Sequence, residues 1–236
     1  MGEHTAILVG TAASIGILHT IVGVDHSLPF ILLARAQRWS LRKLWSVTAL
    51  CGVGHVASSV LLGVVGIAIG AALEELQWIQ TARGHLGAWL LIGFGLAYAT
   101  WSIVRTHRSR AHSHAHGHGD GIVHVHEHTH TDAHTHAHAQ RATRLTAVAL
   151  FIIFVLGPCE LLIPLIMAPA ASHDWVGAGW VVATFGGATV LTMLTLVTIG
   201  HLGLQWRGWL FLERHVHTVA GLLVALSGGA IQVLGI

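Results

Sequence analysis

Two imidazoles and a carboxylate lie close together in an otherwise apolar stretch near the start of the chain. His19, Asp25 and His26 fall within a run that extends from about residue 5 to residue 34. A charged side chain at the centre of a bilayer costs about 2.5–3.5 kcal/mol on insertion scales, so the cluster calls for a reason. Imidazole and carboxylate groups are both ligands of transition-metal ions. The cluster therefore predicts a cation site.

Gly23 and Pro29 bracket this cluster and predict an interruption of the helix. A proline inside a helix removes a backbone hydrogen bond and bends the chain, and freed carbonyls are tolerated within a membrane only where protein surrounds them. The alternative is a kinked helix whose histidines are hydrogen-bonded in the core. For His19 alone, that alternative is the better interpretation.

His55 is a further candidate ligand in the second apolar stretch. It follows Gly54 on a surface of small residues, about one helical turn after Cys51. Small residues at this spacing let helix backbones approach closely. Taken alone, His55 is better explained by a hydrogen bond to a neighbouring helix. When the cluster in the first stretch is considered as well, a role as a metal ligand becomes equally plausible.

A second polar interruption occurs in the fourth apolar stretch, at Gly157, Pro158, Cys159 and Glu160, with Pro164 four residues after the acid. In the first stretch, Asp25 is likewise followed by a proline four residues later. Cys159 and Glu160 are therefore second-rank candidates for the cation site. Gly157, Pro158 and Pro164 are predicted to break the helix.

Residues 107–138 contain twelve histidines, mostly in a His-x-His pattern. Low hydrophobic content predicts a disordered loop, and neutral imidazoles are good ligands for nickel, cobalt, zinc and copper. A solvated linker or an expression tag is the alternative, and the internal position and the alternation argue against a tag. The candidate ligands of this loop are His112, His114, His116, His118, His124, His126, His128, His130, His134, His136 and His138.

The composition places the chain in the membrane class. Only 9% of the residues are charged, 53% are apolar and the mean hydropathy is +0.68. A helix needs about 20 apolar residues to cross the hydrocarbon core. Six stretches meet this length, at approximately residues 5–34, 44–73, 86–104, 145–171, 175–203 and 216–235.

The basic residues predict the orientation. Eleven of the twelve lysines and arginines fall between spans 1 and 2, 3 and 4, or 5 and 6, and only Arg83 falls on the opposite side. By the positive-inside rule, both termini are expected outside and the histidine-rich loop in the cytoplasm of a bacterial-type inner membrane. The net charge of +2 thus reports topology, and no nucleic-acid partner is expected.

These patterns predict an all-α membrane protein whose six transmembrane helices form two inverted three-helix repeats, with helices 1 and 4 broken. Because three is odd, two such halves have opposite orientations in the membrane, which is an architecture of transporters. The expected parts are a first repeat at residues 1–104, the cytoplasmic loop at 105–144 and a second repeat at 145–236.

The residues around His19, Asp25, His26 and Gly54-His55, together with the histidine-rich loop, resemble NicO-type nickel/cobalt transporters and their urease-accessory-like relatives of the LysE-like superfamily. Five residues separate His19 from Asp25, one more than in the His-x4-Asp-His signature of better-known nickel/cobalt permeases. The resemblance implies a metal carrier, and members with cytoplasmic histidine loops are exporters.

A second resemblance rests on Gly157-Pro158-Cys159 and Pro164, which are similar to the Pro-Cys elements of CcdA/DsbD-type membrane electron carriers. Such carriers pass reducing equivalents through a cysteine pair. Cys51, in span 2, would have to act as the partner of Cys159, which requires Cα atoms less than about 7 Å apart.

The first interpretation favours a proton-coupled exporter of divalent metal ions, most of all nickel or cobalt, with zinc or iron as further substrates. The chain is then a carrier in the lipid bilayer, not an enzyme, with no tightly bound cofactor and with metal ions as partners. The alternatives are the thiol electron carrier and a membrane metal sensor or chaperone anchor. The sequence leaves the oligomeric state open, a homo-oligomer included.

Overall fold

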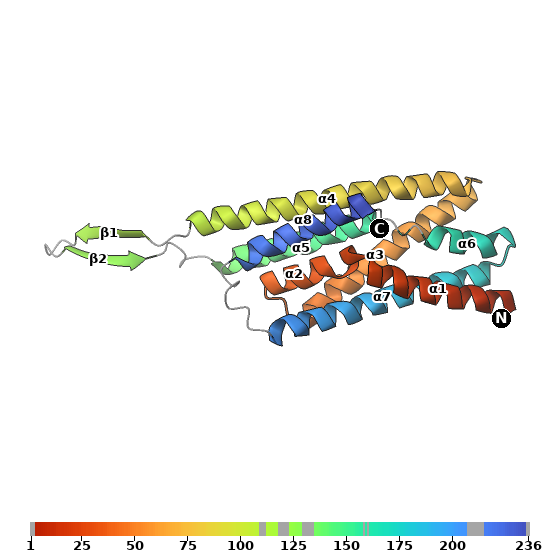
Figure 1. The fold of residues 1–236 in the computed structure, drawn as a ribbon, viewed down its shortest axis with the longest axis horizontal. Coiled ribbons are helices and arrows are strands. Elements are labelled where there is room, and N and C mark those ends of the chain that lie inside the picture. Colours follow the sequence, from red (N-terminus) through yellow and green to blue (C-terminus); the bar gives the residue numbers. More distant parts are fainter. Residues whose placement is uncertain are drawn as a thin grey trace.

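The computed structural model describes residues 3–108, 112–117, 123–128, 135–157, 159, 161–206 and 215–234. Along the chain, its elements are α1 (Glu3–Val22), the 3-10 turn η1 (Val24–His26), α2 (Leu28–Ala36), α3 (Leu41–Ala68), α4 (Leu73–Arg108), β1 (His112–Gly117), β2 (Val123–His128), α5 (Thr135–Leu156), α6 (Leu162–Ala171), α7 (Trp175–Trp206) and α8 (Val216–Leu234) (Figure 1).

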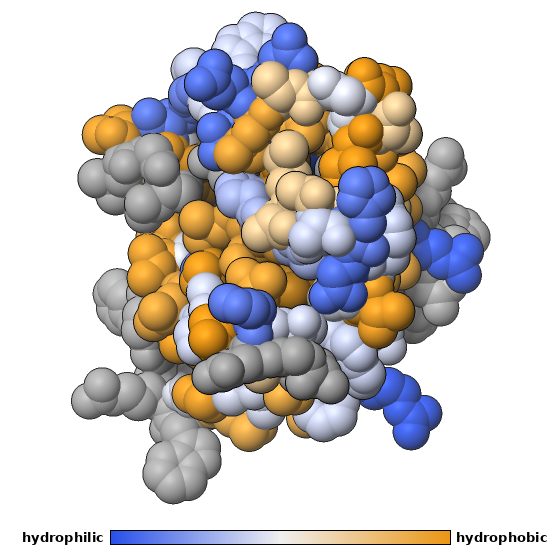
Figure 2. Space-filling view, turned by 90° about the vertical axis from the view of Figure 1, so that its right-hand side faces the viewer, coloured by the Kyte–Doolittle hydropathy of each residue, from blue (hydrophilic) through white to orange (hydrophobic). Residues whose placement is uncertain are grey.

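Five of the described helices are long and apolar enough to cross a membrane. They are His4–Val22, Leu41–Ala68, Leu73–Thr106, Trp175–Gly203 and Val216–Val233. Large apolar side chains on these helices are exposed, as at Trp78 (73%) and Val233 (84%), and an end-on view shows apolar surface between patches of hydrophilic side chains (Figure 2). A water-soluble monomer rarely exposes so much contiguous apolar area, so the chain is a multi-pass membrane protein.

The first and fourth expected spans are both interrupted. The first consists of α1, η1 and α2, and Gly23 forms the extended residue between α1 and η1. The fourth consists of α5 and the short helix α6, with Gly157 just after the end of α5. Pro29 and Pro164 both lie in the first turn of the helix that follows, where a missing N–H leaves no hydrogen bond unmade.

The third expected span is longer than its apolar segment. Helix α4 begins at Leu73, not near residue 86, and it extends through Glu74, Glu75 and Arg83. The hydropathy pattern excluded these charged residues from the span, but a helix can continue past the hydrocarbon core. Arg83 also finds partners inside the bundle, which are described below.

The helices pack so that the two interruptions lie inside the bundle, part-way between its ends (Figure 1). Helix α1 packs along α7, α3 along both α5 and α7, and α4 along α8. Glycines allow the close approaches: a Cβ at Gly16 of α1 would lie 3.0 Å from the Phe185 carbonyl oxygen, and a Cβ at Gly54 of α3 would lie 2.8 Å from the Phe151 ring. These approaches bring α1 against α7 and α3 against α5.

The histidine-rich region contains an antiparallel hairpin of β1 and β2 beyond the end of α4 (Figure 1). His-x-His has the two-residue period of a strand, and these two stretches of the loop expected to be disordered are paired strands in the structure. His112, His114 and His116 are the Cα partners of His128, His126 and His124. His136 and His138 fall at the start of α5, whereas His118, His130 and His134 lie outside the described residues.

Candidate functional site

Three histidines from separate elements meet at the first interruption. One ring nitrogen from each of His19 (α1), His26 (η1) and His55 (α3) lies within 4.8 Å of the other two, and this is the one such group among the described residues. The ring centroids are 4.7 Å apart for His19 and His26, and 5.2 Å apart for His26 and His55. His26 and His55 are almost fully buried, at 2% and 1% exposure.

Neighbouring acceptors fix the orientation of two of these rings. His26 Nδ1 donates to Asp25 Oδ1 at 2.9 Å, and His55 Nδ1 donates to the carbonyl oxygen of Phe154 at 3.2 Å. With Nδ1 protonated in each neutral ring, the lone pair is on Nε2. The Nε2 atoms of His19, His26 and His55 are all buried without a hydrogen-bond partner among the described residues. The rings therefore present three unused nitrogens to one small region.

The helix interruption, not helical periodicity, brings His19 to His26. Seven residues of a continuous helix would separate the two by about 10.5 Å along the axis. The turn at Gly23 and η1 instead folds His26 back toward α1, and a Cβ at Gly23 would clash with His26 Nδ1. Only glycine fits this position, which explains why the cluster contains Gly23.

Cys159 lies at the second interruption. It is fully buried, packs in the apolar cluster formed by α1, α3, α6 and α7, and forms no disulfide with Cys51. Cys159 is not part of the three-histidine group, although a Cβ at Gly157, two residues before it, would lie 3.5 Å from His55 Nδ1. Pro158 and Glu160 lie outside the described residues.

Cys51 is one turn before His55 on α3 and is also fully buried, in the second apolar cluster of the bundle. Cys159 is near the same histidine only in sequence terms, two residues after Gly157, whose added Cβ would lie 3.5 Å from His55 Nδ1. Both cysteines are buried within the helix bundle.

Arg83 is a site residue that the sequence analysis misplaced in an outer connection. Its guanidinium donates to the carbonyl oxygens of Val155 at 2.6 Å and Gly157 at 3.5 Å, and to Ser58 Oγ at 2.9 Å. The last carbonyls of a helix have no intrahelical partner, so Arg83 caps α5 where it ends inside the bundle. The guanidinium also interacts electrostatically with Cys159. An arginine three residues before the third apolar stretch was the only signal in the sequence.

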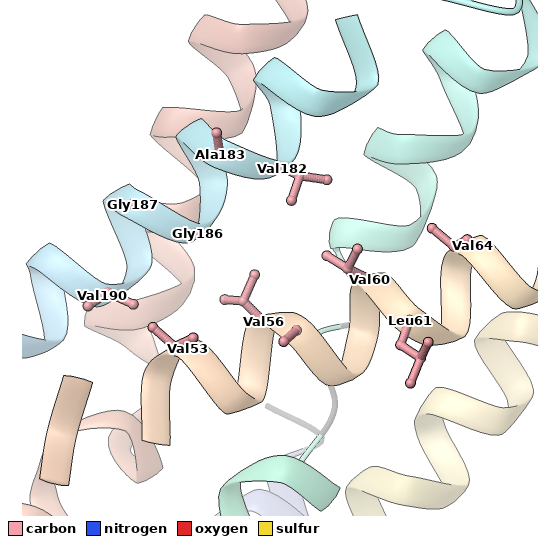
Figure 3. A pocket seen from close by; sticks show the side chains of 11 residues that line it. Val53, Val56, Val60, Leu61, Val64, Val182, Ala183, Gly186, Gly187 and Val190 are labelled. Atoms are coloured by element: carbon pink, nitrogen blue, oxygen red, sulfur yellow. The ribbon is translucent and has the colours of Figure 1, made fainter. Parts of the chain in front are cut away.

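A groove of about 530 Å³ lies beside this site between α3 and α7 (Figure 3). Its walls are formed by aliphatic side chains and glycines, among them Val53, Val56 and Val60 of α3 and Gly186 and Val190 of α7. No polar side chain lines the groove, so its lining can make apolar contacts but contains no side chain that could bind a metal ion or catalyse a reaction.

Fold and site define a multi-pass membrane protein with polar and thiol groups buried at two helix interruptions. Residues 11–230 match the family described as the cytochrome C biogenesis protein transmembrane region, and the chain belongs to that family. Comparisons with curated proteins and with solved structures find no match.

This family assignment corrects the first interpretation. The resemblance to NicO-type transporters is wrong, and with it the expected function of nickel/cobalt export, because the matching family spans nearly the whole chain and is a different one. The resemblance rested on about a dozen residues, mostly histidines, which many unrelated metal-binding or hydrogen-bonded sites share. The Pro-Cys element at Cys159 was the more informative feature.

Proposed function

We propose that this protein carries reducing equivalents across the membrane by thiol–disulfide exchange at Cys159 and Cys51. The match of residues 11–230 to the cytochrome C biogenesis protein transmembrane region is the observation that carries the proposal. The chain has two cysteines, so any internal disulfide has to join these two residues.

The surroundings of Cys159 suit the reactive thiol. It lies where the chain leaves α5 and has not yet begun α6, so its backbone is outside regular helix. The Arg83 guanidinium interacts with it electrostatically, and a nearby cation favours the thiolate, which is the nucleophile in disulfide exchange. Cys51 lies in the interior of α3, in a rigid and apolar setting that suits a resolving thiol.

The exchange proceeds in two balanced steps. The Cys159 thiolate attacks the disulfide of an acceptor protein, forms a mixed disulfide and releases one acceptor thiol. The Cys51 thiolate then attacks Cys159 Sγ, so that the second acceptor thiol leaves and the Cys51–Cys159 disulfide forms. A dithiol protein on the other face reduces this disulfide, and each cycle transfers two electrons and two protons.

Bond formation requires the two Cα atoms to come within about 7 Å. The thiols pack in different apolar clusters, so Cys159 has to move toward α3. Movement costs least there, because a helix end carries fewer backbone hydrogen bonds than a helix interior.

The proposal includes six membrane segments in two inverted repeats, with α1–η1–α2 corresponding to α5 and α6. In support, α1 packs on α7 as α5 packs on α3, and α2 packs on α8 as α6 packs on α4. We also propose that the end bearing Arg35, Arg38, Arg42 and Lys43, which is the end of the hairpin in Figure 1, faces the cytoplasm.

Electron transfer in proteoliposomes tests this function. A reduced dithiol protein is supplied outside and a disulfide-bonded protein inside, and thiols are counted by mass-tagged maleimide. The wild type is expected to reduce the internal disulfide, Cys159→Ser to be inactive, and Cys51→Ser to accumulate a mixed disulfide at Cys159. Equal transfer by the wild type and by the double serine variant would contradict the proposal.

A further inference from the structure

The three-histidine cluster has a chemistry that thiol exchange does not use. We propose that His19, His26 and His55 bind one transition-metal ion of the kind that prefers imidazole ligands, such as zinc, at the first helix interruption. This site goes beyond the proposed function and does not depend on it, because no thiol belongs to the ligand group.

The unused nitrogens are the first argument. A buried polar atom without a hydrogen-bond partner destabilises the fold, and the Nε2 atoms of His19, His26 and His55 are all buried without one among the described residues. The Nδ1 atoms of His26 and His55 donate elsewhere, which leaves their Nε2 atoms as acceptors, and two acceptors cannot satisfy each other. A cation between them satisfies all three at once.

The outer contacts of the rings are those of metal-binding histidines. Ligand histidines commonly donate their second ring nitrogen to a carboxylate or a backbone carbonyl, which fixes the tautomer and strengthens the ligand. His26 does this with Asp25, and His55 with the carbonyl of Phe154. The cluster therefore has one ring bonded to a carboxylate and one ring bonded to a backbone carbonyl.

The dimensions suit a small ion. Three nitrogens no more than 4.8 Å apart surround a centre at most about 2.8 Å from each of them, and a Zn–N bond measures about 2.0–2.1 Å. Movements of about 0.7 Å per ring, within the reach of side-chain torsions, close the difference. Three histidines also leave a fourth coordination position open, as in catalytic zinc sites.

Charge and access are consistent with such an ion. Asp25 lies against the cluster and supplies one negative charge in a region of low dielectric constant. The Asp25 side chain is 26% exposed and His19 is half-buried, so the protein does not close off the cluster completely on their side. Ions that prefer oxygen ligands, such as calcium, would have only the Asp25 carboxylate as a suitable ligand there. Neutral imidazoles instead favour transition metals.

The histidine-rich region complicates a binding test, since it holds twelve more histidines. The experiment therefore uses the full-length chain in nanodiscs with these twelve changed to serine. Zinc binding is measured by metal analysis and by competition with a chromophoric chelator, and cobalt(II) gives the ligand geometry from its visible spectrum.

The loop-serine chain is expected to bind one zinc ion. On this background, His26→Ala or His55→Ala is expected to lower the affinity at least about 100-fold, and Asp25→Asn about 10-fold, because second ring contacts contribute about 10–100-fold. His85→Ala is the matched control: its ring bonds to Gln232 at an exposed place, so the affinity should not change.

Folding of each variant is checked by size exclusion and tryptophan fluorescence. His19→Gln tests the same site at its least buried member, where loss of folding is least expected. An absence of zinc binding in the loop-serine chain, or equal binding after removal of His26 or His55 from a folded chain, would overturn the site. The serine variants of both cysteines should bind zinc as before, which separates this result from the electron-transfer test.

Discussion

The two helix interruptions of this protein differ in how they satisfy their backbone and in what chemistry they present. At the first, the 3-10 turn η1 uses main-chain bonds, such as His26 N–H to the Gly23 carbonyl, and presents imidazoles. At the second, the Arg83 side chain caps the end of α5, and the group presented is the thiol of Cys159. The two interruptions thus present different chemistry.

The different ways in which the two interruptions are held suit a rigid ligand group at the first and a mobile thiol at the second. A main-chain turn holds its side chains rigidly, which suits a preorganised ligand group. A helix end held by one long side chain can be released by moving that side chain, which suits a thiol that has to reach another thiol. Substitutions at the two places should therefore have distinct effects.

The largest effect is expected for Cys159→Ser. Removal of the nucleophile should lower electron transfer in proteoliposomes at least about 100-fold, because a serine hydroxyl does not exchange with disulfides. Zinc affinity of the loop-serine chain, measured in parallel, should change less than about threefold, since the thiol is outside the ligand group. Transfer at the wild-type rate would remove Cys159 from the mechanism.

Gly23→Ala should damage the first interruption. The new methyl group would clash with His26 Nδ1 and lie 3.0 Å from Asp25 Oδ1, so the His26 ring has to shift. Overpacking of this kind costs about 1–3 kcal/mol of unfolding free energy, and zinc affinity should fall about 10-fold.

Gly10→Ala, within α1, is the control for Gly23→Ala, because no atom lies within 4 Å of its added Cβ. Thermal stability in detergent and chelator competition measure the two effects. If both variants behave alike, the steric account of Gly23 is wrong.

Arg83→Lys should damage the second interruption. Lysine keeps the charge but loses the fork that reaches Gln80 Oε1 with one nitrogen and the Val155 carbonyl oxygen with the other, so a part-buried acceptor is left unbonded, at a cost of about 1–3 kcal/mol. Unfolding in mixed detergent micelles measures the loss. Arg105→Lys, at an exposed arginine over the Trp101 ring, should change stability by less than about 0.5 kcal/mol.

The smallest effect is expected for Ser58→Ala. It removes one acceptor of the Arg83 guanidinium, bonded at 2.9 Å, and leaves the Val155 and Gln80 acceptors in place. The loss should be about 0.5–1.5 kcal/mol in the same unfolding measurement. Ser14→Ala, which removes only an exposed bond to the Gly10 carbonyl, should have no measurable effect. A Ser58 effect as large as that of Arg83→Lys would show that the cap depends on the hydroxyl.

The sequence predicted what depends on local chemistry. Apolar length gave the membrane class, and Gly23 and Pro29 marked the place at which α1 gives way to η1 and α2. It also singled out His19, His26 and His55, which the structure brings together. These predictions need only hydropathy, proline geometry and ligand chemistry.

What depends on tertiary contact was not predictable in this way. The role of Arg83 requires the end of α5, which is distant in the sequence, and the nearness of His19 to His26 requires the turn at Gly23. The function was misjudged for a related reason: histidines dominated the polar residues by number, whereas the resemblance to the electron carriers rested on the short Pro-Cys element at Cys159. The number of residues of one type in a sequence does not show which residue determines the function.

The most direct test of thiol transfer is the redox state of Cys51 and Cys159 in the purified full-length chain after incubation with an excess of a disulfide-bonded acceptor protein. Intact-mass analysis with maleimide labelling reports it. We expect the loss of two hydrogen atoms and of both labelling sites, reversed by a dithiol protein, which is the signature of a Cys51–Cys159 disulfide. Two thiols that remain reduced and fully labelled in a folded chain would contradict the account.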